Sequence, residues 1–470
     1  MQYTKIDITV QNCLQKTLEK YPQVVTIAEA LHKAGGQVFL VGGAVRDLLI
    51  GIIPKDLDIE VHNLSLEALE SVLKKFGPIS TVGKSFGVIR VHGIDVDWSL
   101  PRSDSSGRKP MVTVDPHMDA RTAFKRRDVT MNAMGIDLHT LELVDPFDGQ
   151  HDLAQKRLRV TDPQLFIEDP LRFFRVMQFV ARFQMQPDDQ LNKLCARMDI
   201  SGVSRERIEE ECTKWLLKSK RPSLALDWLD KIGRLKEIFP EVAALKGIAQ
   251  EPQWHPEGDV YEHTKQALDA AAALSYDSDR EKLILMYAAL CHDLGKVSTT
   301  QKIEGVIKSH GHALVSKRLA TKLLKRITRD ADLLTSVQKL VAYHMHPLQF
   351  VDNGAKLSAY KRLALKLAPQ VTLCMLAKLA TADRQGRNPH GPKPLTCIPD
   401  VVHTFLAQAE KAQVMHKVEA PILYGRDFID VVAPGPQLGA YVKFAYHLQL
   451  QHGITNKEEL KQMVLRKMLK

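Results

Sequence analysis

The sequence of 470 residues predicts an α+β fold, in which a small mixed β-sheet lies in the N-terminal part and helices form most of the rest. The strand patterns lie between residues 38 and 100, where short apolar runs and alternating apolar and polar residues occur. Beyond residue 160 the apolar residues recur every three or four positions, which is typical of amphipathic helices. A chain of this length has room for three or four domains.

The composition, 44% hydrophobic and 26% charged, is that of an ordinary globular protein. No apolar run is long enough to span a bilayer and the N-terminal residues lack the apolar stretch of a signal peptide, so we expect a cytoplasmic protein with no membrane partner. The six cysteines are scattered without a CxxC pair, which indicates a reducing compartment. The excess of 65 Lys and Arg over 55 Asp and Glu suits a polyanionic partner, although many basic proteins bind no nucleic acid.

The first strong pattern is a strand followed by a glycine turn and a short helix. Val38–Val41 predicts the strand, and it ends at Gly42 and Gly43, where the missing Cβ atoms allow a phosphate or a backbone segment to come close. Ala44–Ile50 predicts the helix, which Gly51 ends. Amphipathic helices are expected before and after this segment, at Val24–Ala34 and Leu66–Phe76.

A second strand carries acidic residues at alternate positions. In Lys55–Val61 the side chains of Asp56, Asp58 and Glu60 face one way, and the apolar residues between them face the other. Two aspartates at positions i and i+2 of one strand face can share divalent cations, which favour carboxylate oxygen. An acidic strand face turned to solvent explains the same pattern about equally well.

A third carboxylate near this pair would complete a two-metal site for phosphoryl transfer. Residues 85–100 predict a pair of strands in which Asp95 and Asp97 share one face. Either aspartate can supply the third carboxylate, and a surface pair is the alternative explanation.

Two later segments combine arginine with aspartate. In Lys125–Asp137, Arg126, Arg127 and Asp128 form a dense charge cluster that opens a helix or turn, and arginine forks suit a triphosphate. The segment EDPLRFFRVMQFVARF, which starts at Glu168, predicts a helix with an apolar face. Its opposite side carries Arg172, Arg175, Gln178 and Arg182. Asp169 followed by Pro170 is also a good helix N-cap, which explains that aspartate without any ligand.

Taken together, GGAVRDLLIG, KDLDIE, RRDVTMNA and EDPLR resemble the motifs of the class II tRNA nucleotidyltransferase and bacterial poly(A) polymerase superfamily. The resemblance implies an N-terminal nucleotidyltransferase head in which Asp56 and Asp58 hold Mg²⁺. It favours Asp97 as the third acid, because Asp97 lies five residues before Arg102. It implies that the incoming nucleotide is bound by Gly43, Arg46, Arg127 and Asp128, and that its base is selected by Asp169, Arg172 and Arg175.

The resemblance assigns Asn132 a positioning role only. The chain departs from the family pattern at Gln178, where the family usually has a further arginine, so one contact to phosphate or base is weaker or replaced.

The second half of the chain contains a dispersed set of possible metal ligands. His263, the doublet His292-Asp293 and the distant Asp383 resemble the ligand set of the HD phosphohydrolase family. Imidazole and carboxylate together suit first-row metals, so we expect a transition metal such as Ni²⁺, Mn²⁺ or Co²⁺. The resemblance implies 2′,3′-cyclic phosphodiesterase, 2′-nucleotidase and phosphatase activities. Four further histidines extend the site to a second metal, bind phosphate, or are ordinary structural residues: His310, His312, His344 and His346.

The motifs divide the chain into four predicted parts. These are a nucleotidyltransferase head at 1–160, a helical neck and body at 161–250, a helical HD domain at 251–390 and a helical C-terminal tail at 391–470.

The leading hypothesis is an ATP/CTP:tRNA nucleotidyltransferase that builds or repairs the 3′-terminal CCA of tRNA without a nucleic-acid template. Its expected partners are the tRNA 3′ end, ATP and CTP. The alternatives are a bacterial poly(A) polymerase, an enzyme that adds only CC or only A, and a metal phosphohydrolase with a degenerate RNA-binding head. The sequence leaves open whether the protein is a monomer or a homodimer.

Overall fold

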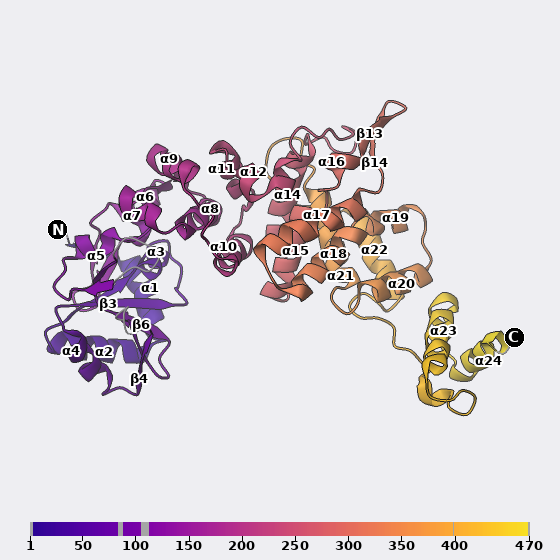
Figure 1. The fold of residues 1–470 in the computed structure, drawn as a ribbon, viewed down its shortest axis with the longest axis horizontal. Coiled ribbons are helices and arrows are strands. Elements are labelled where there is room, and N and C mark those ends of the chain that lie inside the picture. The colour runs from indigo at the N-terminus through magenta and orange to yellow at the C-terminus, as the bar shows by residue number, and fades with distance from the viewer. Residues whose placement is uncertain (1–2, 83–87, 105–111, 398, 469–470) are drawn as a thin grey trace. The chain divides into compact units, whose positions relative to one another are not determined.

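The structure is a computed structural model that describes residues 3–82, 88–104, 112–397 and 399–468. Contacts between Cα atoms divide the chain into two compact units, Met1–Val203 and Ser204–Lys470. Figure 1 shows strands gathered in the first unit and helices through the second. The boundary between the units falls inside the segment predicted as neck and body, 161–250, and the four-part division stays a prediction. No helix among the described residues is long and apolar enough to cross a membrane.

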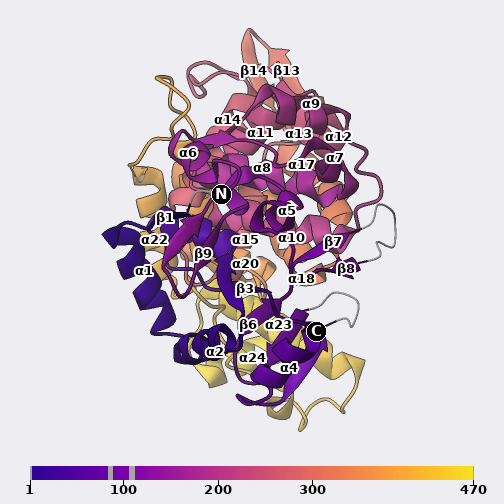
Figure 2. The same ribbon diagram turned by 90° about the vertical axis from the view of Figure 1, so that its left-hand side faces the viewer.

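A mixed sheet of eight strands organises the first unit, as the sequence predicted. Its strand order is β1-β10-β9-β2-β3-β6-β5-β4, and Figure 2 shows β1, β9, β3 and β6 one after another. Neighbouring strands are antiparallel except β3 and β6, which are parallel. The strands are β1 Tyr3–Lys5, β2 Gln37–Val41, β3 Leu57–His62, β4 Ile79–Val82, β5 Val88–Val91, β6 Val96–Ser99, β9 Gly135–Asp137 and β10 Glu142–Val144.

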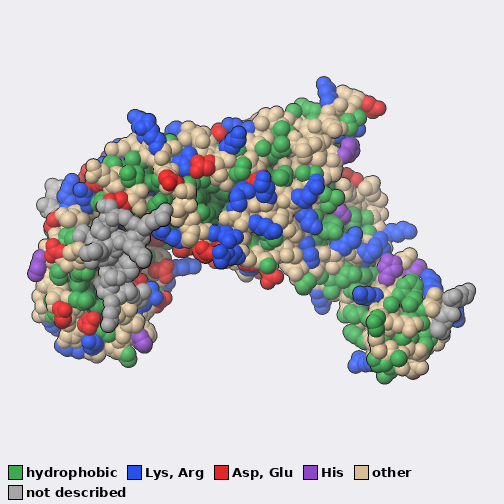
Figure 3. Space-filling view, viewed as in Figure 1, with side chains coloured by type: hydrophobic (Ala, Val, Ile, Leu, Met, Phe, Trp, Pro, Cys, Tyr) green, Lys and Arg blue, Asp and Glu red, His purple; other side chains and the backbone are tan. Residues whose placement is uncertain are grey.

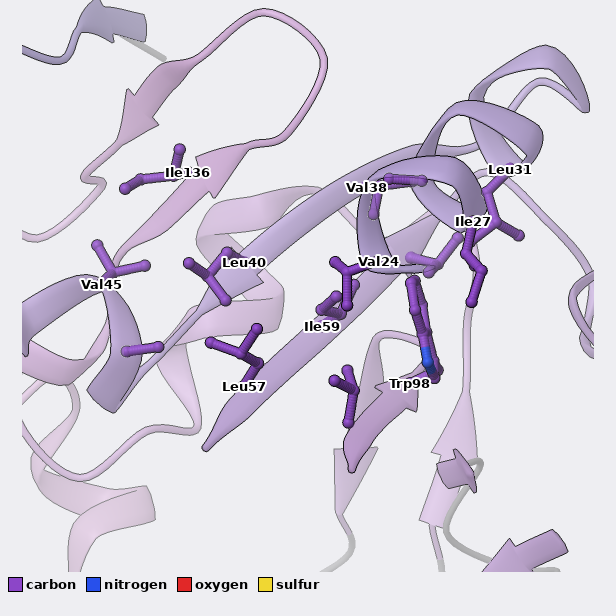
Figure 4. Packing of buried hydrophobic residues seen from close by; sticks show 14 of the residues in the cluster. Val24, Ile27, Leu31, Val38, Leu40, Val45, Leu57, Ile59, Trp98 and Ile136 are labelled. Carbon is purple, nitrogen blue, oxygen red and sulfur yellow. The ribbon is translucent and has the colours of Figure 1, made fainter. Parts of the chain in front are cut away.

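One face of this sheet forms the hydrophobic core with helices. Figure 4 shows Val24 and Ile27 of one helix packed toward Ile59 of β3 and Trp98 of β6. Because side chains alternate along a strand, burying Ile59 and Trp98 turns their neighbours Asp58 and Asp97 to the opposite face. The helices that contribute to this core are α1 Ile8–Leu18, α2 Pro22–Lys33, α3 Gly43–Leu49 and α4 Leu66–Leu73.

The remaining elements of the first unit carry the later motifs. These elements are β7 Arg102–Asp104, β8 Val112–Val114, α5 Ala120–Lys125, η1 Thr130–Asn132, α6 Gly149–Ala154, β11 Arg157–Leu158, α7 Pro163–Glu168, α8 Leu171–Phe183, β12 Gln186–Pro187 and α9 Asp189–Arg197. The charge cluster after Lys125 lies in the turn that follows helix α5 and leads into the short helix η1, which agrees with the predicted helix or turn. One prediction needs correction here. Gln178 does not lie on an exposed polar side: it is 2% exposed, because α8 is buried on most of its circumference.

Among its described residues, the second unit is helical apart from one hairpin, β13 Thr300–Ile303 with β14 Val306–Ser309, which the sequence analysis did not predict. Each strand has only four residues, so its alternation is too short to stand out. The helices through the HD segment are α10 Arg205–Lys218, α11 Ser223–Lys231, α12 Leu235–Ile238, α13 Pro240–Ala243, α14 Val260–Ala273, α15 Asp279–Cys291, α16 Lys296–Thr299, α17 His312–Ile327, α18 Ala331–Tyr343, α19 His346–Asp352, α20 Leu357–Leu367 and α21 Leu373–Gln385.

The chain then continues through α22 Asp400–Lys411, η2 Gly425–Asp427, α23 Pro436–His452 and α24 Lys457–Met468. The last two helices share a small core of their own, in which Leu460 and Val464 of the basic tail are fully buried. That tail therefore has a packing role, in addition to its exposed charges.

Candidate functional sites

The predicted acidic group lies on the open face of the sheet in the first unit. Asp58 of β3 is paired in register with Asp97 of the parallel strand β6. Asp56 precedes β3 by one residue and is exposed, as is Asp58. The alternate candidate, Asp95, lies before β6 begins, so the structure brings Asp97 and not Asp95 beside Asp58.

The electrostatics of this group favour a cation. Partial dehydration raises the pKa of the Asp58 carboxyl, and the negative charges of Asp97 and Asp56 raise it further, whereas Arg127 opposes them. Arg90, which pairs in register with Asp97, donates two hydrogen bonds to it, one of them at 3.0 Å between Nη2 and Oδ2. Adjacent carboxylates with hard oxygen donors fit a divalent ion such as Mg²⁺.

The glycine turn brings an arginine close to these carboxylates. Gly42 has φ of +74°, and a Cβ at this position would lie 2.5 Å from Nη1 of Arg127 and 3.9 Å from Oδ2 of Asp58. Only glycine therefore allows Arg127 to pack over the turn. At Gly43 a Cβ would lie 3.3 Å from Nη2 of Arg46, which is closer than most side-chain contacts.

Glu60 is a site residue that the sequence analysis did not single out. Its side chain is fully buried, and Oε2 lies 3.9 Å from Nη2 of Arg127 and 3.8 Å from Nη2 of Arg126. Oε1 pairs with Nε2 of His62 at 3.0 Å. The alternation in β3 placed Glu60 on the same face as Asp58, and this was the available signal.

A continuous hydrogen-bonded chain joins the motif residues. Asp128 is 6% exposed, and its two oxygens accept from Nδ2 of Asn132 at 2.9 Å and from Nε of Arg175 at 2.6 Å. Asn132 Oδ1 accepts from Nη1 of Arg46 at 2.6 Å, and Arg46 also donates to Asp47. Although burial raises the pKa of Asp128, Arg175 and Asn132 lower it to about 2.

This chain connects α3, η1 and α8, so three motifs that are distant in sequence meet in one place. Arg46 is 5% exposed and its guanidinium carbon lies 4.5 Å from the ring centroid of Phe183 in α8. In this structure Arg46 and Asp128 therefore bind protein groups, and direct contact of either with a nucleotide stays a prediction.

The base-selecting candidates lie at the start of α8. Asp169 Oδ1 accepts a hydrogen bond from the Leu171 amide at 3.1 Å. Helix α8 begins at Leu171 with Pro170 as its N-cap residue, so Asp169 lies one position before the cap, and not at it as the sequence predicted. Arg172 donates to the carbonyl oxygens of Leu165, at 2.8 Å, and of Arg126. Arg172 and Arg175 are half-buried and lie one helical turn apart on the same side of α8.

In the second unit, the predicted ligands converge from three helices. His263 of α14 has its Nε2 3.2 Å from Nε2 of His292, which follows α15, and 3.2 Å from Oδ1 of Asp383 of α21. Asp293 Oδ2 lies 3.2 Å from Nε2 of His292. All four groups are buried or nearly so, and this set of nitrogen and oxygen donors fits a first-row transition metal.

The structure separates the four additional histidines into two classes. Nε2 of His312 and of His344 lie 3.3 Å and 3.9 Å from Oδ1 of Asp293, and the three form a second group within metal-binding distance of one another. Asp293 thus faces both groups, one with each oxygen. His310 is exposed and His346 packs against Tyr343, so neither joins the cluster.

The imidazoles are oriented by their other nitrogens. Nδ1 of His292, His312 and His344 each lies 2.7 to 2.8 Å from a backbone carbonyl, which leaves Nε2 unprotonated and directed at the cluster. Burial lowers the pKa of His344 to about 3, so it is neutral, the form that binds metals. Glu257 Oε1 lies 2.7 Å from Nδ1 of His263 and orients that ring in the same way.

Sequence analysis missed Glu257 and two cations beside the cluster. Lys296 Nζ lies 2.7 Å from Asp293 Oδ2, and Arg387 Nη2 lies 2.7 Å from Asp383 Oδ1. Although burial raises the pKa of Asp293, His292 and Lys296 hold it well below its usual range. The helical spacing of Lys296 and Arg387, three and four residues after a ligand, was the signal that could have found them.

Two segments of the chain match known domain families. Residues 38–159 match the family described as poly A polymerase head domain, and residues 260–380 match the HD domain family. The chain is 32% identical over 370 residues to a "Multifunctional CCA protein" of Neisseria meningitidis serogroup A, covering 76% of this chain and 85% of that protein. It is 30% identical over 364 residues to the protein of the same name from Pasteurella multocida, covering 75% and 84%.

Solved structures show the same fold. A Thermotoga maritima CCA-adding enzyme complexed with tRNA aligns over all of both chains, with a TM-score of 0.59 and 18% identity. A Bacillus stearothermophilus CCA-adding enzyme in complex with CTP aligns over 95% of this chain and 97% of that chain, with a TM-score of 0.62 and 19% identity.

Proposed function

Because this chain belongs to the multifunctional CCA protein family, we propose that it is a tRNA nucleotidyltransferase that adds or repairs the 3′-terminal CCA with CTP and ATP, without a nucleic-acid template. The observation that carries the proposal is the register pairing of Asp58 with Asp97 beside Arg127. This arrangement combines a cation site with an adjacent guanidinium, which are the two groups that a nucleoside triphosphate needs.

Asp56, Asp58 and Asp97 would hold Mg²⁺ in this proposal. When bound, Mg²⁺ supplies charge stabilisation at the reacting phosphate oxygens. Arg127 binds the triphosphate beside the turn at Gly43, and the buried Glu60 holds its guanidinium in place.

The nucleotide base is selected at α8. Asp169, Arg172 and Arg175 offer acceptors and donors that complement the edges of cytosine and adenine. Asp128 and Asn132 have a positioning role. Asp128 accepts a hydrogen bond from Arg175, and Asn132 connects Asp128 to Arg46. Through this hydrogen-bonded chain, binding of a nucleotide at α8 is coupled to the position of helix α3, which follows the glycine turn.

The proposed tRNA partner is supported by basic surface. Figure 3 shows Lys and Arg side chains gathered over the part of the second unit where α10, α15 and α17 lie. On α17 the exposed basic residues are Lys317, Arg318, Lys322, Lys325 and Arg326. Such a row suits the phosphates of an RNA backbone.

The test supplies the protein with Mg²⁺ and a tRNA transcript that lacks its last three nucleotides. CTP alone, ATP alone and both together are given, and products are resolved on sequencing gels. We expect two cytidines with CTP and one further adenosine only when both nucleotides are present. A long adenosine ladder would indicate a poly(A) polymerase, and addition of CC only or A only would indicate a partial enzyme. Persistence of addition in Asp56→Ala would refute the proposed metal site.

We propose a second activity, hydrolysis of phosphate esters such as 2′,3′-cyclic nucleotides and 2′-nucleotides, at the buried cluster. His263, His292, Asp293 and Asp383 would hold a transition metal such as Ni²⁺, Mn²⁺ or Co²⁺, and Asp293 with His312 and His344 offers a second position. A metal bound there supplies an ionised water at neutral pH.

Two neighbouring histidines give a matched test of this second activity. His312→Ala should lower both the bound Ni²⁺ and the rate of 2′,3′-cyclic AMP hydrolysis, the rate by about 100-fold. His310→Ala should leave the metal content, measured by plasma mass spectrometry, unchanged, because His310 is outside the cluster. Equal effects of the two substitutions would contradict the assignment.

A further inference from the structure

Two polar side chains, Glu60 and His62, are buried on the strand that carries Asp58. All three residues point to the same face of β3, because alternate side chains of a strand share a face. Glu60 is fully buried and His62 is 4% exposed. Charged and polar side chains are rarely buried this deeply unless their hydrogen bonds are satisfied within the protein. The partners of this pair therefore indicate what it does.

The imidazole of His62 has an acceptor at each of its nitrogens. Nδ1 lies 3.0 Å from the carbonyl oxygen of Met118, and Nε2 lies 3.0 Å from Oε1 of Glu60. Glu60 is ionised: although burial raises its pKa, His62 and two nearby arginines hold it below its usual range. A carbonyl oxygen and an ionised carboxylate can only accept. Both nitrogens therefore donate, and the ring of His62 is positively charged.

The second oxygen of Glu60 faces the two arginines without a hydrogen bond. Oε2 lies 3.8 Å from Nη2 of Arg126 and 3.9 Å from Nη2 of Arg127, which is longer than a hydrogen bond. Among the described residues Oε2 accepts from no donor. The carboxylate thus attracts both guanidinium groups but leaves their N–H groups available. Arg127 packs over the turn at Gly42, close to Asp58, and so lies beside the proposed transferase site.

The surroundings of Arg127 favour a further anion. Burial lowers the pKa of its guanidinium, and the charge of Arg126 acts in the same direction. Glu60 and Asp58 oppose this effect without cancelling it. The terminal phosphates of a nucleoside triphosphate supply the missing negative charge, and a guanidinium fork binds their oxygens well.

We propose that His62 is a positioning residue for the triphosphate of the incoming nucleotide, and that it acts through Glu60 on Arg127. By donating to Oε1, the imidazole holds the carboxylate in an orientation from which Oε2 attracts Arg127 but does not bind its N–H groups. The guanidinium then stays available to phosphate oxygens. This inference rests on the proposed transferase function and adds a residue that touches neither the nucleotide nor the metal.

Loss of the imidazole changes the partners of a buried charge. Without His62, the Glu60 carboxylate has only the two arginines to compensate it, because it is closed to solvent. A buried carboxylate without a hydrogen bond is unfavourable, so it turns to accept from Arg127 and withdraws that guanidinium from the triphosphate. Binding of the terminal phosphates is weakened, whereas the metal-binding carboxylates and the base-selecting residues of α8 are unchanged.

The kinetic test measures CTP incorporation into a tRNA that lacks its last three nucleotides. We expect His62→Gln to raise the KM for CTP about tenfold and to leave kcat unchanged. His92→Gln is the matched control, because His92 is exposed, and both constants should stay as in wild type. A lower kcat with an unchanged KM in His62→Gln would mean that His62 only supports the fold, and would overturn the inference.

A double-mutant cycle tests whether His62 acts through Glu60. Glu60→Gln keeps the size of the side chain but removes the charge that His62 compensates. Adding His62→Gln to Glu60→Gln should therefore leave the KM for CTP where Glu60→Gln alone sets it. Independent, multiplying increases in KM would show that His62 acts by another route, and the inference would be wrong.

A binding measurement separates the inference from the proposed activity. Calorimetry with Mg²⁺ and without tRNA compares CTP with CMP, which lacks the two terminal phosphates. We expect His62→Gln to weaken CTP binding about tenfold and to leave CMP binding unchanged. If wild type adds no nucleotide but shows this difference, the transferase function fails and the role of His62 stands. If wild type adds CCA and His62→Gln binds CTP like wild type, the function stands and the role of His62 fails.

Discussion

The two candidate sites differ in how far the protein itself completes them. In the first unit Asp56 and Asp58 are exposed, and Arg90 supplies the positive charge beside Asp97. In the second unit the ligands are buried, and their imidazoles are aligned by hydrogen bonds to backbone carbonyls. The cluster of the second unit is thus built by folding, whereas the carboxylates of the first unit need a ligand to compensate their charge.

The proposed functions account for this difference, because they require the two sites to admit different groups. A site that receives an RNA end and two different nucleotides must stay open, so its groups lie on a sheet face and a helix start. A site that holds a resident metal gains from burial, because dehydration strengthens the hold of fixed donors on the ion. Four predictions break or sharpen this comparison.

The largest effect is expected from removing one carboxylate of each site in turn. Asp58→Asn should lower nucleotide addition about 1,000-fold and leave ester hydrolysis unchanged, whereas Asp293→Asn should do the reverse. Both rates are measured on each purified variant, with CTP incorporation for one and 2′,3′-cyclic AMP hydrolysis for the other. A joint loss in either variant would mean that the two sites are not independent.

A smaller effect is expected from replacing Asp128, which holds α8 through its pair with Arg175. Because folding lowers the pKa of Asp128 to about 2, its contribution to the free energy of unfolding is present above its ordinary pKa and is lost as the pH falls through about 2. At pH 7, Asp128→Asn should therefore destabilise the packing of α8 by roughly 2 kcal/mol. The difference in the stability of α8 between Asp128→Asn and wild type should shrink as the pH falls from about 4 to about 2.

Hydrogen exchange of the α8 amides, followed by mass spectrometry, measures this difference. Asp189→Asn is the matched control, because Asp189 is exposed in the first turn of α9 and should change nothing. Equal protection of α8 in Asp128→Asn and wild type would show that the Arg175 pair contributes no stability.

The glycine turn offers a matched pair of substitutions. Gly42 and Gly51 have nearly the same φ, +74° and +75°, but a Cβ meets Arg127 at Gly42 and nothing within 4 Å at Gly51. Gly42→Ala and Gly51→Ala should thus incur similar backbone strain. Only Gly42→Ala should also raise the KM for CTP, by about tenfold, because it displaces the guanidinium. Steady-state kinetics that show the same KM in both variants would remove Arg127 from the proposed site.

The smallest effect is expected at Arg90. Its pair with Asp97 is largely exposed, so breaking it costs little stability. Arg90→Ala should lower the Mg²⁺ concentration for half-maximal CTP incorporation about threefold, because Asp97 no longer has a competing partner. An increase in that concentration would instead mean that Arg90 helps to hold the carboxylates in place.

The sequence by itself supplied most of the candidate residues of both sites, although it did not point to Glu60, Glu257, Lys296 or Arg387. Alternation along β3 placed Asp58 opposite the core, the glycine pair marked the turn, and three motifs identified the arginines, since each depends on residues close together in the chain. The fold class could be predicted for the same reason, because strand and helix periodicities are local properties.

The tertiary structure decided which of the candidates meet. The register of β6 against β3 places Asp97, and not Asp95, beside Asp58. His312 at the start of α17 and His344 at the end of α18 reach the cluster, whereas His310 and His346 do not. Gln178 became buried, and Arg46 became part of a chain to Arg175. These outcomes depend on contacts between segments far apart in sequence, where packing and charge compensation act and periodicity carries no information.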